Sequence, residues 1–275
     1  MTENSDTRQT EPALTLNDLE VGYGPFTVLR GLSLFVQAGE SVALIGANGA
    51  GKSTVLKAVA GFVRPRQGSI KLMGKDISGL RPHQVLQQGC AYVAQGQDLF
   101  PEMSVKENVE MGGYLLNSAA RVRTRLDICM DLFPILREKA TIKAGGLSGG
   151  ERQQMKIARA LMTEPNVLLL DEPSAGLDPI TVDRVFDDLR TVRQQTNVGV
   201  LLVEQNVSKA LDNAERVCVL NLGVVSRTAT PQELANDGGI RDVYLGATTS
   251  ERRTSSTPEL TNNDQSKARG REDQA

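Results

Sequence analysis

The sequence predicts an α/β fold with a mostly parallel sheet flanked by helices, and three observations carry that prediction. Continuous apolar runs suit strands that are buried on both faces of a parallel sheet. They alternate with segments of helical periodicity, and a glycine-rich loop joins the first run to the first helix. The apolar runs cover residues 42–45, 167–170, 200–203 and 217–220, and the helical patterns cover about 52–61, 149–163, 180–196 and 206–214. Ligands of such folds bind at the carboxyl ends of the strands.

Two regions depart from this pattern. Residues 14–16 and 32–36 alternate apolar with polar side chains, which predicts half-buried strands of an antiparallel β subdomain. Residues 104–145 contain no strand-like run and predict two helices, the second kinked or ended by Pro134. These two helices are expected near 104–116 and 119–138. We therefore expect an inserted helical subdomain beside the α/β core.

The chain is expected to form one folded domain over residues 13–246, with the helical subdomain at about 96–160. Residues 1–12 and 247–275 are expected to be disordered tails, because they are polar and the second contains only Leu260 as a sizeable apolar side chain. A docking segment is the alternative for the C-terminal tail.

The composition limits the class of protein. Lys and Arg number 31 against 33 Asp and Glu, so the net charge of −2 gives no global basic field for nucleic acid. Cys90, Cys129 and Cys218 lack a CxxC spacing, which is typical of free thiols in a reducing compartment. No stretch approaches the ~18 apolar residues of a membrane span, and residues 1–10 lack the apolar core of a signal peptide. We expect a cytoplasmic protein with no nucleic-acid partner.

The glycine-rich loop after the first parallel strand is a candidate phosphate-binding loop. Glycines let the backbone curl so that several N–H groups point at one anion, and the positive end of the next helix adds to the attraction. In this pattern the lysine reaches the β- and γ-phosphates and the next hydroxyl binds Mg²⁺. The loop comprises Gly46, Ala47, Asn48, Gly49, Ala50, Gly51, Lys52, Ser53 and Thr54. A chance match is the alternative, but the strand–helix context favours a P-loop NTPase core that binds nucleotide.

Two adjacent carboxylates, Asp171 and Glu172, end the second parallel strand. Neighbouring side chains on an extended strand diverge, so the two are expected to have different tasks. Asp171 would face the Mg²⁺ shell, and Glu172 would act as general base on the attacking water. Helix capping or a surface turn is the alternative, which the phosphate loop makes less favourable.

A second glycine-rich helix start lies at Ser148, Gly149 and Gly150. Ser148 with Glu151 three residues later predicts a capping box. A capping box does not require two glycines, and bare amides at a positive helix end offer a second place for a phosphate. Two phosphate-binding elements in one chain suggest two half-sites that a second copy completes.

These motifs together resemble the ATP-binding subunits of ABC transporters. Residues 46–54 resemble the phosphate loop of that family, and residues 147–153 resemble its signature motif. Asp171 and Glu172 follow at the interval typical of the family, and the resemblance extends from about 14 to 246.

The resemblance implies ATP hydrolysis by a head-to-tail dimer that holds two ATP molecules at its interface. Each ATP would be bound by the phosphate loop of one subunit and by Ser148, Gly149 and Gly150 of the other. Lys52 and Mg²⁺ would stabilise the transferring phosphoryl group, with Ser53, Gln95 and Asp171 near the metal.

Three further positions match the family by the same resemblance. Tyr23 matches the aromatic residue that stacks on adenine, and an ordinary tyrosine at a strand end is the alternative. Gln95 matches the glutamine that touches Mg²⁺ and signals to the membrane partner, although it could be a surface glutamine. Asp178 matches the aspartate that crosses the dimer interface, and helix capping is a second, compatible role.

One position departs from the family. Gln205 stands where the family usually has a histidine that contacts the γ-phosphate, and the only histidine, His83, is expected at the surface in a polar connector. Glutamine can donate a hydrogen bond to a phosphate oxygen but does not titrate near neutral pH. Either this half-site turns over with Gln205, or it is a slower site paired with a histidine-bearing subunit. The intact Glu172 argues against an inactive site.

Several segments resemble the ATPases of branched-chain amino-acid importers. They are residues 45–52, 100–108, 202–206 and 243–246. This resemblance implies integral membrane subunits, a second ATPase subunit in a homodimer or heterodimer, and indirectly an extracytoplasmic solute-binding protein. It also implies a peripheral location on the inner face of the membrane. Urea-type and lipopolysaccharide-export ATPases share many of these sequence features.

The membrane subunits are expected to dock near Gln95 and residues 96–145, in a groove for which Leu99, Phe100 and Met103 are candidate lining residues. Packing of these three into the core is the alternative. A soluble single-module ABC-type ATPase for cofactor assembly or repair is the other class that the sequence leaves open.

Overall fold

A computed structural model describes residues 11–96 and 99–236. The two predicted tails lie outside these residues, except for Glu11 and Pro12 of the N-terminal one. The segment 243–246, which carried part of the importer resemblance, also lies outside them. Within the described part no helix is both long and apolar enough to cross a membrane.

A six-stranded sheet forms the centre of the molecule, in the order β10-β9-β3-β8-β7-β6. The pairs among β9, β3, β8, β7 and β6 are parallel, and β10 joins β9 antiparallel. The strands are β3 (Ser41–Ile45), β6 (Cys90–Val93), β7 (Val167–Asp171), β8 (Gly199–Val203), β9 (Arg216–Asn221) and β10 (Val224–Ala229). All four predicted apolar runs are parallel strands, as expected.

Both faces of this sheet are buried, which explains the continuous apolar runs. Along β7, Leu169 belongs to one hydrophobic cluster while Leu168 and Leu170 belong to another on the opposite face. Neighbouring β8 repeats the alternation, with Leu201 on the first face and Leu202 on the second. Each fully buried leucine stabilises the fold by roughly 1.5–3 kcal/mol.

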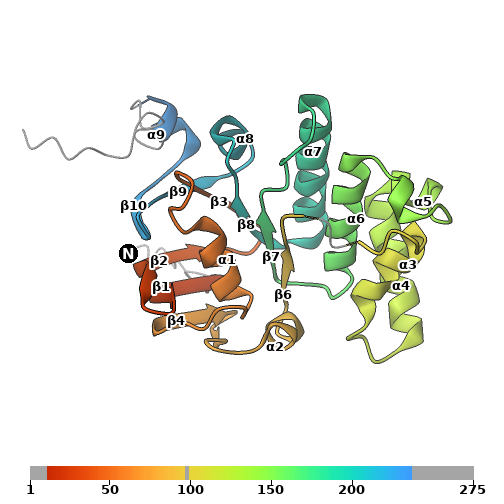
Figure 1. Ribbon diagram of the computed structural model, residues 1–275. Coiled ribbons are helices and arrows are strands. Elements are labelled where there is room, and N and C mark those ends of the chain that lie inside the picture. The colour runs from red at the N-terminus through yellow and green to blue at the C-terminus, as the bar shows by residue number, and fades with distance from the viewer. Residues whose placement is uncertain (1–10, 97–98, 237–275) are drawn as a thin grey trace, which may run out of the picture.

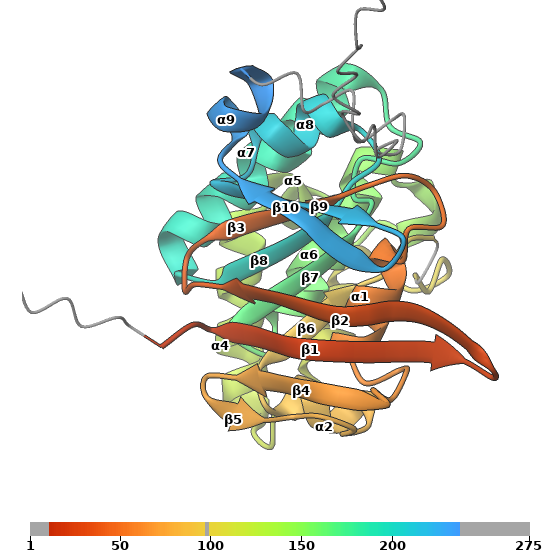
Figure 2. The same ribbon diagram turned by 90° about the vertical axis from the view of Figure 1, so that its left-hand side faces the viewer.

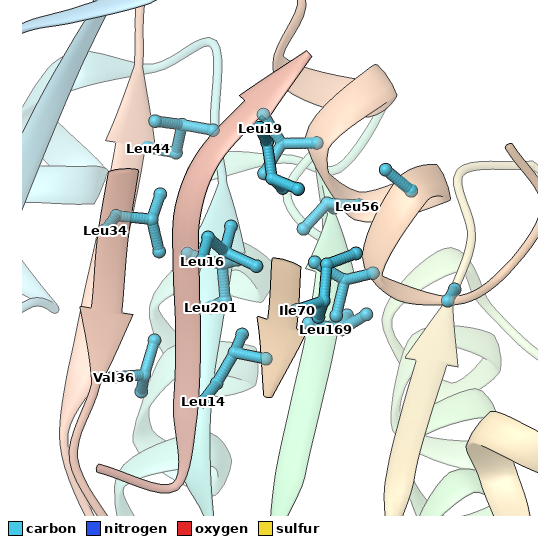
Figure 3. Packing of buried hydrophobic residues seen from close by; sticks show 14 of the residues in the cluster. Leu14, Leu16, Leu19, Leu34, Val36, Leu44, Leu56, Ile70, Leu169 and Leu201 are labelled. Atoms are coloured by element: carbon cyan, nitrogen blue, oxygen red, sulfur yellow. The ribbon is translucent and has the colours of Figure 1, made fainter. Parts of the chain in front are cut away.

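A second, antiparallel sheet covers one face of the first, in the order β2-β1-β4-β5. Its strands are β1 (Leu14–Tyr23), β2 (Phe26–Val36), β4 (Gln67–Leu72) and β5 (Lys75–Asp76). Helix α1 (Lys52–Val59) packs with both sheets, and Figure 3 shows leucines of β1, α1, β7 and β8 gathered in one cluster. Figure 2 shows β1, β2 and β4 in front, with β6 and β7 of the parallel sheet behind them. The predicted antiparallel strands at 14–16 and 32–36 are confirmed, and the structure shows in addition that they pair with each other, Leu14 with Val36.

The helices cluster on the other face of the parallel sheet, away from β1, β2 and β4 (Figure 1). They include α3 (Val105–Glu110), α4 (Ala119–Leu132), α5 (Pro134–Glu138), α6 (Gly149–Leu161) and α7 (Pro179–Thr196). Short 3-10 turns lie at Met111–Gly113 and Ala144–Gly146, and the remaining helices are α2 (Pro82–Gln87), α8 (Val207–Asp212) and α9 (Pro231–Asn236).

The region 104–145 is helical, as predicted, with two differences in detail. The first helix ends at Glu110 and continues only as a 3-10 turn. The second is divided at Phe133, because Pro134 cannot donate a backbone hydrogen bond and instead begins α5. The expectation that His83 lies in a connector was wrong, since His83 lies in α2 after Pro82 at the first helical position; its surface exposure is confirmed.

The three cysteines are buried and unpaired. Burial raises the pKa of Cys90 to about 12 and that of Cys129 to about 11, and it also raises the pKa of Cys218. Since the thiolate is the reactive form, these three side chains are inert packing groups.

Candidate functional site

The glycine-rich loop connects β3 to α1 in a conformation that requires its glycines. Gly49 and Gly51 have φ of 80° and 108°, in the left-handed region that glycine tolerates. A Cβ at Gly46 would lie 2.3 Å from the carbonyl oxygen of Leu220. The loop also closes on itself, because the amide of Ala50 donates to the carbonyl of Ala47 at 3.1 Å. The remaining loop positions Asn48 and Thr54 lie in the same segment, exposed and half-buried respectively.

The turn between β9 and β10 braces this loop. The amide of Gly223 donates to the carbonyl of Ala50 at 3.0 Å, and its carbonyl accepts from the amide of Arg30 in β2 at 3.0 Å. A Cβ on Gly223 would lie 1.8 Å from the carbonyl oxygen of Val28, so only glycine fits between the loop and β2. This contact was not predicted, because it joins segments that are far apart in the chain.

Lys52 lies at the start of α1, with its ammonium held over the loop. Its Nζ donates to the carbonyls of Gly46 at 2.8 Å and Ala47 at 3.2 Å. Burial lowers the pKa of Lys52, and the negative charges of Glu172 and Asp171 act in the opposite direction. The lysine therefore shares one electrostatic site with both carboxylates that end β7.

Asp171 is buried at the end of β7 and uses both carboxylate oxygens. Its Oδ1 accepts from the Ser53 hydroxyl at 3.1 Å, and its Oδ2 accepts from the Tyr92 hydroxyl at 2.9 Å. Tyr92 on β6 contacts Phe62 through a tilted ring pair with centroids 5.8 Å apart. The structure thus places Ser53 and Asp171 together, and it adds Tyr92, which the sequence analysis did not single out.

Glu172 points to a different partner from Asp171. Its Oε2 accepts from the Nε2 of Gln95 at 2.6 Å. The divergence has a stronger cause than the alternation of a strand, because Glu172 has a φ of 49° and its amide still donates to Val203 at 2.9 Å. A non-glycine residue in this region costs about 1–3 kcal/mol, and it persists only where the surroundings hold it.

The end of β8 contributes a buried carboxylate and an exposed amide. Glu204 is 1% exposed, and burial raises its pKa, although hydrogen bonds from Ser174 and from the backbone amides of Asn206 and Gln205 oppose this. Its Oε1 accepts from the Ser174 amide at 3.0 Å and its Oε2 accepts from the Ser174 hydroxyl at 2.8 Å. Gln205, the next residue, is exposed.

The second glycine-rich helix start opens α6, within the helical region (Figure 1). The predicted capping box is confirmed: the Ser148 hydroxyl accepts from the Glu151 amide at 3.4 Å, and Glu151 accepts from the Ser148 amide at 3.0 Å. Glu151 also pairs with Lys139 at 2.5 Å. Ser148 and Gly149 are exposed.

Packing gives the two glycines of this helix start a reason that the sequence did not provide. A Cβ on Gly149 would lie 2.8 Å from Leu177, and a Cβ on Gly150 would lie 2.3 Å from Thr181. Thr181 is in turn held by Asp178, whose Oδ1 accepts from its amide at 3.1 Å and caps α7. The hydroxyl of Thr181 also donates to Asp178, and this hydrogen bond together with that of the amide lowers the pKa of Asp178. The predicted capping role of Asp178 is therefore confirmed.

Tyr23 ends β1 at an exposed hairpin, with 46% of its surface accessible. The guanidinium of Arg66 donates to the neighbouring carbonyl of Gly24 and, at 3.1 Å, to the hydroxyl of Thr27. Arg66 thus fixes the hairpin that presents the tyrosine ring to solvent.

A cavity of about 350 Å³ lies beside Tyr92, between α2, β6 and the helical region. Exposed aromatic and apolar side chains line it together with Lys156 and Arg159 of α6. These side chains are Phe62, Phe100, Met111 and Tyr114. Of the residues expected in a groove, Phe100 lines this cavity, Met103 lines a shallower neighbouring hollow, and Leu99 packs against the core.

The structure therefore brings together Lys52, Ser53, Asp171, Glu172 and Gln95 at the carboxyl ends of β3, β6 and β7. The capping box of Ser148 belongs to another part of the chain, on α6. Lys156 of the same helix donates to the carbonyl of Gly96, beside Gln95.

Comparison with known proteins places these features in context. The family model described as ABC transporter matches residues 29–175 of this chain. A high-affinity branched-chain amino acid transport ATP-binding protein, BraG of Pseudomonas aeruginosa, is 39% identical over 85% of this chain and 99% of its own length. A probable branched-chain amino acid transport ATP-binding protein, LivF of Archaeoglobus fulgidus, is 37% identical over 83% of this chain and 96% of its own.

A lipopolysaccharide export system ATP-binding protein, LptB of Haemophilus influenzae, is also 37% identical, over 85% of this chain and 97% of its own length. Among solved structures, the ADP conformation of an ATP-binding cassette of an ABC transporter matches with a TM-score of 0.77 and 25% identity, covering 86% of this chain and all of that one. A dimeric post-hydrolysis cassette bound to ADP and Pi matches with a TM-score of 0.68 and 25% identity, covering 79% of this chain and 98% of that one.

Proposed function

This chain belongs to the ABC transporter family as an ATP-binding and ATP-hydrolysing subunit, and from that premise we propose that it energises the import of branched-chain amino acids or similar small solutes. The observation that supports the site is the meeting of Lys52, Ser53, Asp171 and Glu172 at one edge of the parallel sheet. We take residues 13–246 as the ATP-binding domain, with a helical subdomain at about 96–160 and tails at 1–12 and 247–275.

The phosphate loop binds the triphosphate of ATP in this proposal. Its backbone amides and the start of α1 attract the phosphates, and Tyr23 stacks on the adenine ring. Lys52 transfers its hydrogen bonds from the carbonyls of Gly46 and Ala47 to the β- and γ-phosphates, where it offsets the charge of the transferring group.

The residues beside the loop fit Mg²⁺. Ser53 and Asp171 offer a hydroxyl and a carboxylate within 3.1 Å of each other, and oxygen ligands of this kind are what Mg²⁺ prefers. The Gln95 amide oxygen is a third candidate ligand. When bound, Mg²⁺ neutralises charge on the phosphate oxygens. Tyr92 orients Asp171 through its hydroxyl, so the carboxylate is held before the nucleotide arrives.

Glu172 accepts a proton from the attacking water. Its carboxylate is held by Gln95 at 2.6 Å, and this contact has to loosen before Glu172 can reach the water. Gln205 donates a hydrogen bond to a γ-phosphate oxygen from the end of β8. Because an amide does not titrate near neutral pH, Gln205 keeps this donor across the neutral range.

A second subunit completes the site. Ser148, Gly149 and Gly150 of the partner contact the γ-phosphate from the other side, and Asp178 lies at the interface between the two subunits. The exposure of Ser148 and Gly149 in this chain is compatible with such a partner. The companion is either a second copy or a different ATPase subunit.

The partners also include integral membrane subunits, through which closure of the dimer moves solute. The cavity beside Tyr92, with Phe62, Phe100 and Tyr114 at its rim, suits an apolar helix end of such a subunit. An extracytoplasmic solute-binding protein would deliver the cargo, and this chain would lie at the inner face of the membrane.

The test is to capture this chain from membranes in mild detergent, identify the proteins that accompany it, and reconstitute the complex in vesicles. We expect integral membrane subunits to be captured, and labelled leucine, isoleucine or valine to be transported only with ATP. Capture of soluble partners alone would support cofactor assembly or repair instead.

Lipopolysaccharide export is the second candidate function, because LptB of Haemophilus influenzae is as similar to this chain as LivF is. The same reconstitution distinguishes them. An exporter complex would extract a glycolipid from the membrane and leave branched-chain amino acids untransported.

A further inference from the structure

Glu204 is a buried carboxylate that the proposed mechanism does not use. It follows β8, is 1% exposed, and directly precedes Gln205. Burying a charged carboxylate is costly unless hydrogen bonds compensate. A buried side chain of this kind therefore calls for a structural or functional reason.

The contacts of Glu204 converge on one residue of a neighbouring loop. Its two oxygens accept from the amide and the hydroxyl of Ser174, at 3.0 and 2.8 Å. Ser174 lies two residues after Glu172 and four before Asp178. The carboxylate thus fixes the middle of the loop that carries both residues to their places.

That loop is held in an unfavourable backbone conformation. Glu172 has a φ of 49°, while its amide donates to Val203 at 2.9 Å and its carbonyl accepts from Ala175 at 3.1 Å. A residue in this region stays there only when neighbouring contacts determine its position. The two hydrogen bonds from Ser174 to Glu204 are contacts of this kind, made only two residues after Glu172.

The same side chain belongs to the segment that carries Gln205. Glu204 directly follows β8 and is the residue immediately before Gln205. One side chain therefore connects the end of β8 with the loop that follows β7.

We propose that Glu204 is a positioning residue for ATP hydrolysis: by binding Ser174 it sets Glu172 and Asp178 relative to Gln205. This inference rests on the proposed roles of Glu172, Asp178 and Gln205. It predicts that loss of the clamp slows the chemical step, because a displacement of about 1 Å can cost ~100-fold in rate, while the phosphate loop still binds ATP.

The test compares Glu204→Ala, Glu204→Gln and Ser174→Ala in the full chain, purified with its membrane subunits and companion ATPase. Glutamine can accept from the Ser174 amide and donate to its hydroxyl, so Glu204→Gln should keep kcat within about twofold. Glu204→Ala should lower kcat at least about tenfold, with KM and the binding of a fluorescent ATP analogue changed less than about threefold.

The double variant Ser174→Ala with Glu204→Ala separates positioning from general damage. If the two residues act as one unit, the double variant should be no slower than Glu204→Ala. Ser174→Ala keeps the amide contact and offers a milder variant should Glu204→Ala fold poorly; it should lower kcat about two- to tenfold.

Glu215→Ala is the matched control. Glu215 also accepts from a distant backbone amide, that of Ser41 at 2.7 Å, but at the amino end of β3. This variant should lower the melting temperature and leave kcat unchanged. Equal kcat in wild type, Glu204→Ala and Ser174→Ala would overturn the inference alone, whereas a wild-type complex without ATPase activity would overturn the proposed function.

Discussion

Two glycine-rich helix starts, at α1 and at α6, use the same local chemistry in opposite surroundings. The loop before α1 is held by its own chain, through Lys52, the backbone of Gly223 and the hydrogen bond of Ser53 to Asp171. The start of α6 is exposed at Ser148 and Gly149 and is satisfied by its own capping box. A helix start that is surrounded by its own chain is thus distinguished from one that is exposed to solvent.

The difference teaches that a helix N-terminus alone does not define a complete site. The start of α1 has a lysine and two carboxylates beside it that face the loop, whereas at the start of α6 the carboxylate of Glu151 is used by the capping box and by its ion pair with Lys139. In our proposal the second gains its ligand only when another subunit brings it. This difference between the starts of α1 and α6 can be tested with single substitutions.

The largest effect is expected from Glu172→Gln. The amide can still accept from Gln95 but cannot take a proton from water, so hydrolysis should fall by at least about 100-fold. Light scattering with saturating ATP should then detect a stable dimer with the companion subunit. A particle that remains monomeric at all protein concentrations would break the contrast, since α6 would then have no outward role.

Lys52→Ala and Ser148→Ala test the two helix starts directly. Removing the lysine deletes charged hydrogen bonds to phosphate and should weaken ATP binding by the isolated chain by about 10- to 100-fold. Ser148→Ala should cost about 1 kcal/mol of stability as a lost cap, yet leave ATP binding by the isolated chain unchanged. Calorimetric titration with ATP measures the binding of both variants, and thermal unfolding measures the stability of Ser148→Ala. Weaker ATP binding by Ser148→Ala would show that one chain uses both helix starts.

Gly223→Ala tests the brace behind the phosphate loop. The added methyl would meet the Val28 carbonyl, so the turn must shift, and we expect a loss of about 1–3 kcal/mol in stability with severalfold weaker ATP binding. Gly31→Ala is the control, because Gly31 also has a positive φ, 64°, but has open space around it. Equal unfolding and binding curves for the two variants would remove the brace from the account.

Tyr92→Phe removes one hydroxyl and keeps the ring contact with Phe62. Asp171 would lose a hydrogen bond worth about 0.5–1.5 kcal/mol, so the Mg²⁺ concentration for half-maximal ATPase activity should shift about two- to tenfold. A Phe62→Leu variant, which alters the cavity without touching Asp171, should leave the Mg²⁺ titration in place. An unchanged titration in Tyr92→Phe would mean that Ser53 alone orients the carboxylate.

The smallest effect is expected from Gln205→His. Imidazole titrates near pH 6.5, so the variant should add a titration between about pH 5 and 8 to the pH profile of kcat that it shares with the parent. Its maximal rate should stay within a few-fold of the parent. Identical rates and pH profiles would remove Gln205 from the mechanism.

Much of the fold could be predicted because burial leaves a local trace. The runs in β3, β7, β8 and β9 are apolar on both faces, and that pattern survives in short windows of sequence. β4, β5, β6 and β10 were not predicted. Exposed positions interrupt the apolar pattern in β4, β5 and β10, and β6 is only four residues long with a half-buried tyrosine within it. The predicted helix boundaries differ from the observed ones at Pro134, where a new helix begins, and after Glu110, where the helix gives way to a 3-10 turn.

Without the family resemblance, which also pointed to Gln95, the site was predictable only where its residues are close in sequence. Lys52 with Ser53 and Asp171 with Glu172 form local motifs, and Asp178 gave a local capping pattern. Tyr92, Gly223 and Glu204 were not predicted because their contacts join segments 30 to 193 residues apart, and no sequence periodicity indicates such contacts. For Gly149 and Gly150 the sequence suggested anion binding, whereas contacts with Leu177 and Thr181 provide a packing reason as well.

The inert thiols offer an experimental handle on subunit closure. Cys90, Cys129 and Cys218 are all buried, so a spin label or fluorophore should react with a cysteine introduced on the surface while the native three are left in place. Lys75→Cys in β5 and Glu138→Cys at the end of α5, both at exposed positions outside the phosphate loop, would give such attachment points. Probe-to-probe separations could then follow the association of subunits in real time without a cysteine-free background.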